Sequence, residues 1–286
     1  MDPSLKMLDI VIQGNDESFL PFRSMKLYGK TGRVLSFFQQ LQALLYSMQL
    51  NWDDHPKVFF VHSRPLTSKY ENLLKKYSVE TIYRPCENTG NISDTCNAQR
   101  LDLLSYGGFG NTHSLYLNLD ILCLKPPVFD FSKDAQLMYA GTSYDAIWGA
   151  LYNLCGINLE NYNLQQNAYI AYNRTGDTNL FPFFNNGVVF INNEFAKTIV
   201  NDISMFTDIL KNADRANHAP QIATSIAVIK NTNNWGILPK GCNFIPGLFR
   251  NSTKWRNRIS LYHYCGSRGT LETNTYQQYF DWNTPS

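Results

Sequence analysis

Hydrophobic positions follow two periodicities that alternate along the first half of the chain. An apolar run over residues 8–13 ends in Gly14-Asn15-Asp16, which is typical of a strand followed by a turn. Apolar residues three and four positions apart over 34–48 predict an amphipathic helix. The same patterns predict further strands at 57–62, 79–83 and 114–124, and further helices at 68–76 and 94–104. Strands that alternate with helices favour βαβ units and a mainly parallel sheet.

The second half is less regular, and its Asn-rich stretch over residues 153–179 is expected to be a loop. Strands are predicted at 136–140, 187–192, 235–238 and 261–264, and helices at 194–210 and 219–229. No internal repeat and no Pro/Gly-rich linker separates the two halves. We therefore expect one continuous α/β domain over residues 1–286.

The predicted strand 114–124 carries two polar residues, Asn118 and Asp120, among apolar neighbours. Residues two apart on a strand face the same way, so both side chains would point to one side. Burying an ionised carboxylate is costly unless a cation or a hydrogen-bonding group compensates it. In open α/β sheets, ligands bind outside the carboxyl ends of the strands. This pattern predicts a metal or phosphate site at the end of the strand.

The composition is that of an ordinary globular enzyme, with 286 residues, 44% hydrophobic and 17% charged, enough to build a sizeable core. A net charge of +2 and the lack of a Lys/Arg run argue against nucleic-acid binding. The sequence has no signal-peptide pattern and no apolar stretch of membrane-spanning length, which predicts a cytoplasmic protein without a transmembrane segment. Six cysteines without a CxxC pair favour free thiols over structural zinc.

Four short motifs occur in an order that resembles the GT-A glycosyltransferases, particularly glycosyltransferase family 8. Residues 100–124 resemble the family's nucleotide-sugar segment, in which an arginine-bearing helix precedes a strand with an Asp-x-Asp motif. Residues 184–192 resemble the acceptor-side strand, and Gln221 stands where the family has an Asp-Gln pair. Residues 261–268 resemble the C-terminal His-x-x-Gly-x-x-Lys motif. The order of the four motifs carries the resemblance, since each alone is short and degenerate.

The resemblance implies a GT-A (nucleotide-diphospho-sugar transferase) fold, with a mainly parallel Rossmann-like sheet flanked by helices. Residues 1–124 would form its nucleotide-binding half and residues 125–286 its acceptor-binding half. Three positions depart from the family's motifs. Asn118 replaces the first Asp of Asp-x-Asp, Pro220 replaces the Asp before Gln221, and Arg268 replaces the final Lys.

The resemblance also implies an activity, which is the metal-assisted transfer of a sugar from a nucleotide-diphosphate donor to a hydroxyl acceptor with retention. The donor that the resemblance implies is a UDP-sugar. The expected cofactor is Mn²⁺ or Mg²⁺, and an imidazole ligand suits Mn²⁺ better. The predicted metal ligands are Asp120, Asn118 and His263. The predicted donor-binding residues are Gln13, Arg100, Asn118, Asp120 and Arg268, and the predicted catalytic residues are Asp120, Asn185 and Gln221.

Simpler roles remain open for several of these residues. His263 could be a hydrogen-bonded core histidine, Asn185 could form a turn with the next two residues, and Gln221 could be a polar residue in a first helical turn. Two other functions also remain open. One is an inverting glycosyltransferase with a carboxylate base, and the other is a nucleotide- or sugar-binding protein without transfer activity. The candidates for that base are Asp145, Asp177 and Asp214.

Overall fold

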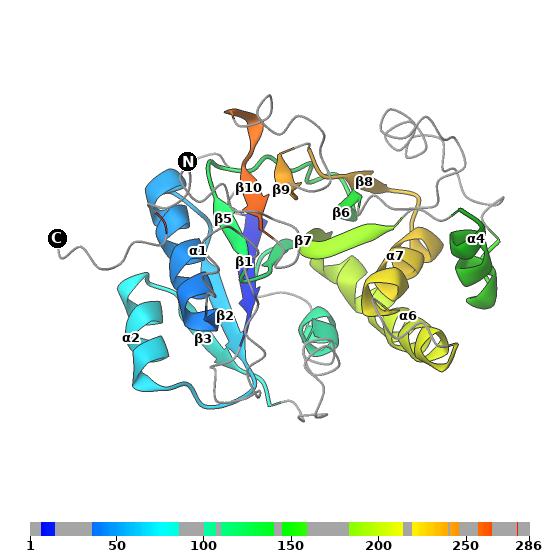
Figure 1. The fold of residues 1–286 in the computed structure, drawn as a ribbon, viewed down its shortest axis with the longest axis horizontal. Helices are drawn as coiled ribbons and strands as arrows, with labels where there is room; N and C mark the ends of the chain where they lie inside the picture. The colour runs from blue at the N-terminus through cyan, green and yellow to red at the C-terminus, as the bar shows by residue number, and fades with distance from the viewer. Residues whose placement is uncertain are drawn as a thin grey trace, which may run out of the picture.

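The computed structural model describes residues 7–14, 36–85, 100–106, 110–139, 145–158, 183–213, 219–239, 241–245, 257–264 and 279. Its centre is a seven-stranded sheet in the order β3-β2-β1-β4-β7-β6-β8 (Figure 1). The first four strands of that order run parallel, β7 is antiparallel to both of its neighbours, and β6 and β8 are parallel. This arrangement confirms the predicted mainly parallel α/β sheet. The strands are β1 (Leu8–Gln13), β2 (Val58–His62), β3 (Glu80–Tyr83), β4 (His113–Leu117), β6 (Ala135–Tyr139), β7 (Phe184–Asn192) and β8 (Trp235–Ile237).

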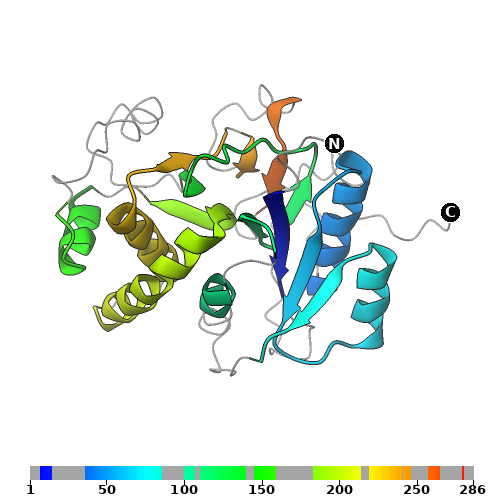
Figure 2. The same cartoon turned by 180° about the vertical axis from the view of Figure 1, so that it is seen from behind.

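Helices cover both faces of the sheet (Figures 1 and 2). Ile10 and Ile12 of β1 point to the face covered by α1 (Phe37–Asn51) and α2 (Ser68–Lys76). The residue between them, Val11, packs in the core on the opposite face, because successive strand residues alternate sides. That second core is built with α4 (Asp145–Leu154), α6 (Asn193–Asn212), α7 (Ala219–Asn231) and the helix over 100–106.

A second, three-stranded sheet has the order β5-β10-β9. It consists of β5 (Ile121–Cys123), β10 (Leu261–His263) and β9 (Cys242–Phe244). Its own small core is formed mainly by the aromatic rings of Phe244, Tyr262, Tyr264 and Tyr279. This sheet brings the C-terminal strand β10 beside the segment that follows β4, so residues from distant parts of the sequence meet there.

The prediction of a single strand over 114–124 is wrong. Strand β4 ends at Leu117 in the large sheet, the chain turns at residues 118–120, and β5 begins at Ile121 in the small sheet. Both strands are fully buried, so their apolar residues read as one continuous run. The polar residues Asn118 and Asp120 mark the passage between the sheets and do not share one face of a strand.

The other predicted elements that lie wholly within the described residues are present, with bounds within three residues of those expected. Of the predicted helix 94–104, the described part begins at residue 100 and runs to 106. Two short elements, α4 and β9, were not predicted. Strands from both predicted halves, 1–124 and 125–286, pair with one another in each sheet. In the described part of the chain, no helix is long and apolar enough to cross a membrane.

The junction between β7 and α6 depends on one side chain. Asn192 is both the last residue of β7 and the N-cap of α6, and its Oδ1 accepts hydrogen bonds from the backbone N–H groups of Glu194 (3.0 Å) and Phe195 (3.1 Å). Thr67 occupies the N-cap of α2 without a side-chain capping bond. Substitutions at these two N-cap positions can therefore be compared, since one removes capping hydrogen bonds and the other removes none.

We expect Asn192→Ala to lower the free energy of unfolding by about 1 kcal/mol, because two amide groups at the start of α6 lose their acceptor. Thr67→Ala should change it much less, since no such bond is lost. Urea denaturation of both variants measures the difference. Equal losses at the two positions would show that the Asn192 cap does not stabilise α6.

Candidate functional site

The predicted site residues gather where β1 and β4 end. These two strands are parallel neighbours, so Gln13 and Leu117 lie at the same edge of the sheet, the edge at which α/β proteins bind ligands. Antiparallel β7 begins at this edge and is irregular there. Leu137 of β6 pairs with Val189 but Met138 pairs with Asn185, so residues 186–188 bulge away from β6. Bulges of this kind re-aim side chains near functional sites.

Arg100 connects the three strand ends. Its guanidinium donates to the backbone carbonyl of Asn186 on β7 (2.6 Å), to Asn118 Oδ1 after β4 (3.0 Å) and to Gln13 Oε1 at the end of β1 (3.5 Å). The planar fork of an arginine suits such divergent contacts. The predicted donor-binding residues Gln13, Arg100 and Asn118 are therefore brought together.

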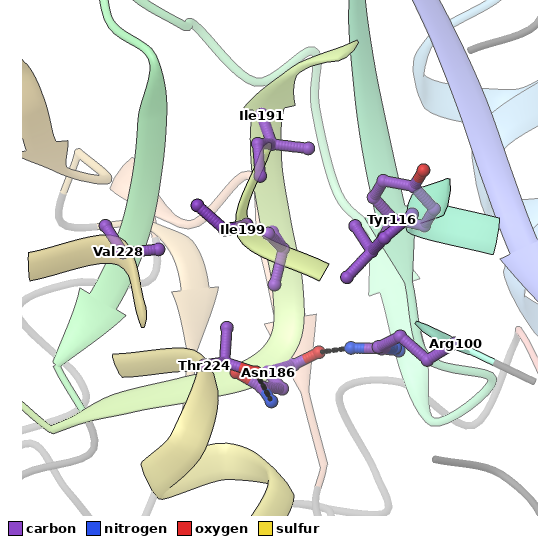
Figure 3. Close-up of a pocket in the computed structure, with 9 residues that line it drawn as sticks. Arg100, Tyr116, Asn186, Ile191, Ile199, Thr224 and Val228 are labelled. Carbon is purple, nitrogen blue, oxygen red and sulfur yellow. Dashed lines mark hydrogen bonds between the residues drawn. The ribbon is translucent and has the colours of Figure 1, made fainter. Parts of the chain in front are cut away.

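Arg100 also lines a small cavity, together with Asn186, Thr224 and a set of mainly apolar side chains (Figure 3). Asn186 Nδ2 donates to Thr224 Oγ1 (3.2 Å), which links β7 to α7. Asn186 Oδ1 is buried and has no hydrogen-bond partner within the described part of the chain. The cavity has room for about one water molecule. A space of this size cannot hold a nucleotide or a sugar.

Asp120 and His263 form the charged centre of the site. Asp120 Oδ1 lies 3.2 Å from His263 Nε2, and the two side chains are 13% and 2% exposed. The pairing of β5 with β10 explains the contact, because Ile121 lies opposite His263 and the next N–H, of Tyr264, donates to the Asp120 carbonyl (3.1 Å). Burial raises the pKa of Asp120, but the charge and hydrogen bond of His263 outweigh burial and hold the pKa below its ordinary value.

A chain of amides supports His263 from its other side. His263 Nδ1 lies 2.8 Å from Asn243 Oδ1, and Asn243 Nδ2 donates to Asn185 Oδ1 (3.0 Å). The same Asn185 oxygen accepts the backbone N–H of Gly187 (2.8 Å). Sequence reasoning missed Asn243. The available signal was the one that drew attention to Asn118, an amide inside a short apolar run, here between Cys242 and Phe244.

Gly187 lies against the ring of His263. A Cβ at this position would overlap His263 Cε1 and lie 2.5 Å from its Nδ1 and 2.8 Å from Asn185 Oδ1. The Gly187 carbonyl also accepts the backbone N–H of Asn118 (2.9 Å). Asn185 and Gly187 lie within the bulged β7, and the bond from the Gly187 N–H to Asn185 Oδ1 is the local contact of an Asx turn, in agreement with the turn alternative. The His263 alternative, a hydrogen-bonded buried histidine, agrees with its 2% exposure.

Two predicted groupings are not reproduced in the described part of the chain. Asn118 and Asp120 have different partners, Arg100 for the first and His263 for the second. Gln221 lies in the first turn of α7, and no described contact joins its side chain to Asp120 or His263. Four further predicted positions lie outside the residues or side chains described, namely Arg268, Asp145, Asp177 and Asp214.

Within the described residues, no group of three or more His, Cys, Asp or Glu side chains could hold a metal ion. The predicted ligand set therefore consists of one carboxylate, Asp120, one imidazole, His263, and the amide of Asn118. The Asn118 oxygen already accepts a hydrogen bond from Arg100. A metal at this site stays a prediction.

Comparison with known proteins identifies the fold. No family model and no curated protein matches the sequence. The structure is similar to the galactosyltransferase LgtC in complex with donor and acceptor sugar analogs, with a TM-score of 0.59, 14% identity, and coverage of 97% of this chain and 98% of that one. It is also similar to the glycosyltransferase GlyE of Streptococcus pneumoniae TIGR4, with a TM-score of 0.57, 12% identity, and coverage of 95% of this chain and 60% of that one. The predicted GT-A fold is confirmed, and the resemblance to family 8 stays a prediction.

We expect Gly187→Ala to lower the free energy of unfolding by about 1–3 kcal/mol, because the added methyl group overpacks against the buried ring of His263. Gly236→Ala on β8 is the matched control. Its Cβ would meet Lys133 Cγ at 3.6 Å, an ordinary van der Waals distance, so its stability should change little. Chemical denaturation of the two variants tests this difference, and a Gly187→Ala variant as stable as the control would contradict the proposed packing.

Proposed function

We propose that this chain is a glycosyltransferase that transfers a sugar from a nucleotide-diphosphate donor to a hydroxyl acceptor. The observation that carries the proposal is the contact between Asp120 and His263, which are 143 residues apart in the sequence and meet 3.2 Å apart beside the carboxyl ends of the parallel strands. The fold shared with two glycosyltransferases over at least 95% of the chain supports it. One of those relatives was solved with donor and acceptor sugar analogs.

The side-chain atoms of Asp120 and His263 fit the coordination of a divalent cation. Two neighbouring ligands on one ion, each about 2.1 Å from it, lie about 3 Å apart, close to the separation of Asp120 Oδ1 and His263 Nε2. One carboxylate and one imidazole suit Mn²⁺ better than Mg²⁺. A cation held there would neutralise the charge that develops on the leaving diphosphate. Two protein ligands leave the other coordination positions to donor oxygens, water or the Asn118 amide.

Arg100 and Asn118 are proposed to bind the donor next to this pair. Arg100 lies among Gln13, Asn118 and the bulge of β7, at the edge where the phosphates are expected. Because Asn118 Oδ1 accepts from Arg100, its Nδ2 group is the part that can donate to an oxygen of the donor. This arrangement favours a role for Asn118 in orienting the donor.

We further propose a UDP-sugar donor and retention of configuration, both of which rest on the resemblance to family 8. In the retaining route the leaving phosphate can accept the acceptor's proton, so the protein needs no separate carboxylate base. An inverting enzyme would need one, with Asp145, Asp177 and Asp214 as the candidates. NMR analysis of the product's anomeric configuration separates the two reactions. Asn185 and Gln221 are proposed as catalytic residues, as the motifs imply.

We expect Asp120→Asn to weaken Mn²⁺-dependent binding of UDP by at least about 100-fold, the upper end of the loss seen when an outer partner of a metal ligand is removed. The control is Asp202→Asn on α6, which removes the same charge from a pair with Lys230 on the surface. It should bind UDP and Mn²⁺ as the parent does. Thermal-shift titration with UDP, with and without Mn²⁺, measures the effect. A parent-like response of Asp120→Asn would mean that the proposed site is misplaced.

Asn118→Asp tests whether residue 118 also holds the cation. The new carboxylate would pair with Arg100, so stability without metal should be kept or increased. If residue 118 is a ligand, the Mn²⁺-dependent stabilisation by UDP should grow, because a carboxylate binds Mn²⁺ more strongly than an amide does. An unchanged Mn²⁺ response would mean that residue 118 contacts Arg100 and the nucleotide-sugar donor and does not bind the cation. Slow metal-dependent hydrolysis of UDP-sugars by the parent would distinguish a transferase from a binding protein.

A further inference from the structure

The backbone of Asn243 has a conformation that few residues other than glycine adopt. Its φ is 85°, and the residue is completely buried in β9. For most residues with a side chain, this region costs about 1–2 kcal/mol, and asparagine is among the residues that adopt it most readily. Such strain persists where the surrounding structure or a function requires it. The question is what the asparagine side chain provides that glycine, which adopts this conformation without cost, would not.

The hydrogen-bond directions around Asn243 follow from a backbone group that can only donate. The N–H of Gly187 requires an acceptor, so the atom of Asn185 that faces it is the oxygen. Asn243 also faces this oxygen and must present its Nδ2 group, because two carbonyl oxygens would repel each other. The oxygen of Asn243 is then directed at His263 Nδ1, 2.8 Å away.

An acceptor at this place requires a hydrogen atom on His263 Nδ1. The other nitrogen, Nε2, faces Asp120 Oδ1 at 3.2 Å. In the imidazolium it donates to that carboxylate, and in the neutral Nδ1–H form it is the nitrogen whose lone pair can bind a cation. Without the amide of Asn243, the opposite tautomer would be favoured, since an Nε2–H group could donate directly to the carboxylate of Asp120. In that form Nε2 could not bind a metal.

We infer that Asn243 is a positioning residue, which fixes His263 in the Nδ1–H form and directs Nε2 to the space beside Asp120. A series of hydrogen bonds connects the N–H of Gly187 through the side chains of Asn185 and Asn243 to the imidazole of His263. The inference concerns the state of His263 and stands on the contacts alone, whereas its consequence for metal binding rests on the proposed function. Partners of this kind orient metal-binding histidines and typically change metal affinity by about 10–100-fold.

Two substitutions separate the side chain of Asn243 from its backbone. Asn243→Gly keeps the conformation at φ 85° without strain and removes the amide, so the variant should fold with equal or higher stability. Asn243→Asp retains an acceptor for the Nδ1–H group, although it loses the bond to Asn185. A role confined to the backbone predicts the same histidine state in both variants.

The test is ¹⁵N NMR of histidine-labelled protein at alkaline pH without metal, nucleotide or sugar, with the His263 signals assigned by means of His263→Gln. We expect Nδ1 to carry hydrogen in the parent and in Asn243→Asp, and to lose it in Asn243→Gly. An unprotonated Nδ1 in the parent, or a protonated Nδ1 in the folded Asn243→Gly variant, would overturn the inference.

A second measurement connects the inference to the proposed function. Thermal-shift titration with UDP and Mn²⁺ should show an affinity at least about 10-fold lower for Asn243→Gly than for the parent. If the parent does not respond to Mn²⁺ and UDP but the NMR result holds, the proposed function fails and the positioning role stands. If the parent responds and Asn243→Gly matches it in both measurements, the positioning role fails and the proposed function stands.

Discussion

The close approach of the His263 ring to the backbone of Gly187 is the contact on which the site depends. It joins the seven-stranded sheet, which contains Gly187, to the three-stranded sheet, which contains His263. A side chain at residue 187 would occupy the volume of the imidazole. The same residue donates its N–H to Asn185 and accepts the N–H of Asn118, so one glycine contacts the His263 ring, the Asn185 side chain and the Asn118 backbone.

The bulge in β7 makes this approach possible. A regular antiparallel strand would continue its pairing with β6 through residues 186–188, whereas the observed register skips them. The released backbone turns its carbonyl groups toward Arg100 and Asn118 and away from β6. Arg100 therefore holds the irregular segment as well as the ends of β1 and β4. A site supported in this way is organised before any ligand arrives, which is what precise chemistry requires.

Local patterns were sufficient to predict most of the fold. Short apolar runs identified β1 and β2, which bury side chains in both cores, and helical spacing identified α2 and α7, each of which packs against one core. The break at residues 118–120 was not predictable in the same way. All residues of β4 and β5 are buried, and only three residues separate the two strands, so their apolar residues form one apparent run. Strand β9 is three residues long, too short for any periodicity.

The candidate site was predictable only in part. The order of the motifs suggested that Asp120 and His263 meet, and the contact between them agrees with this. The amide chain through Asn243 was missed for two reasons. The partners of Asn243 are distant in sequence, and the types of the neighbouring residues do not indicate its positive φ. Asn118 was grouped with Asp120 by spacing, but the turn between the two sheets separates their side chains and directs Asn118 to Arg100.

The central claim is that a divalent cation binds between Asp120 and His263 and contacts a nucleotide diphosphate bound next to this pair. Anomalous diffraction at the manganese absorption edge, from crystals grown with UDP and Mn²⁺, tests it most directly. The account predicts a single manganese peak between these two side chains, in contact with the diphosphate. UDP bound at the carboxyl edge of the sheet without a manganese peak there, or with manganese at another place on the chain, would contradict it.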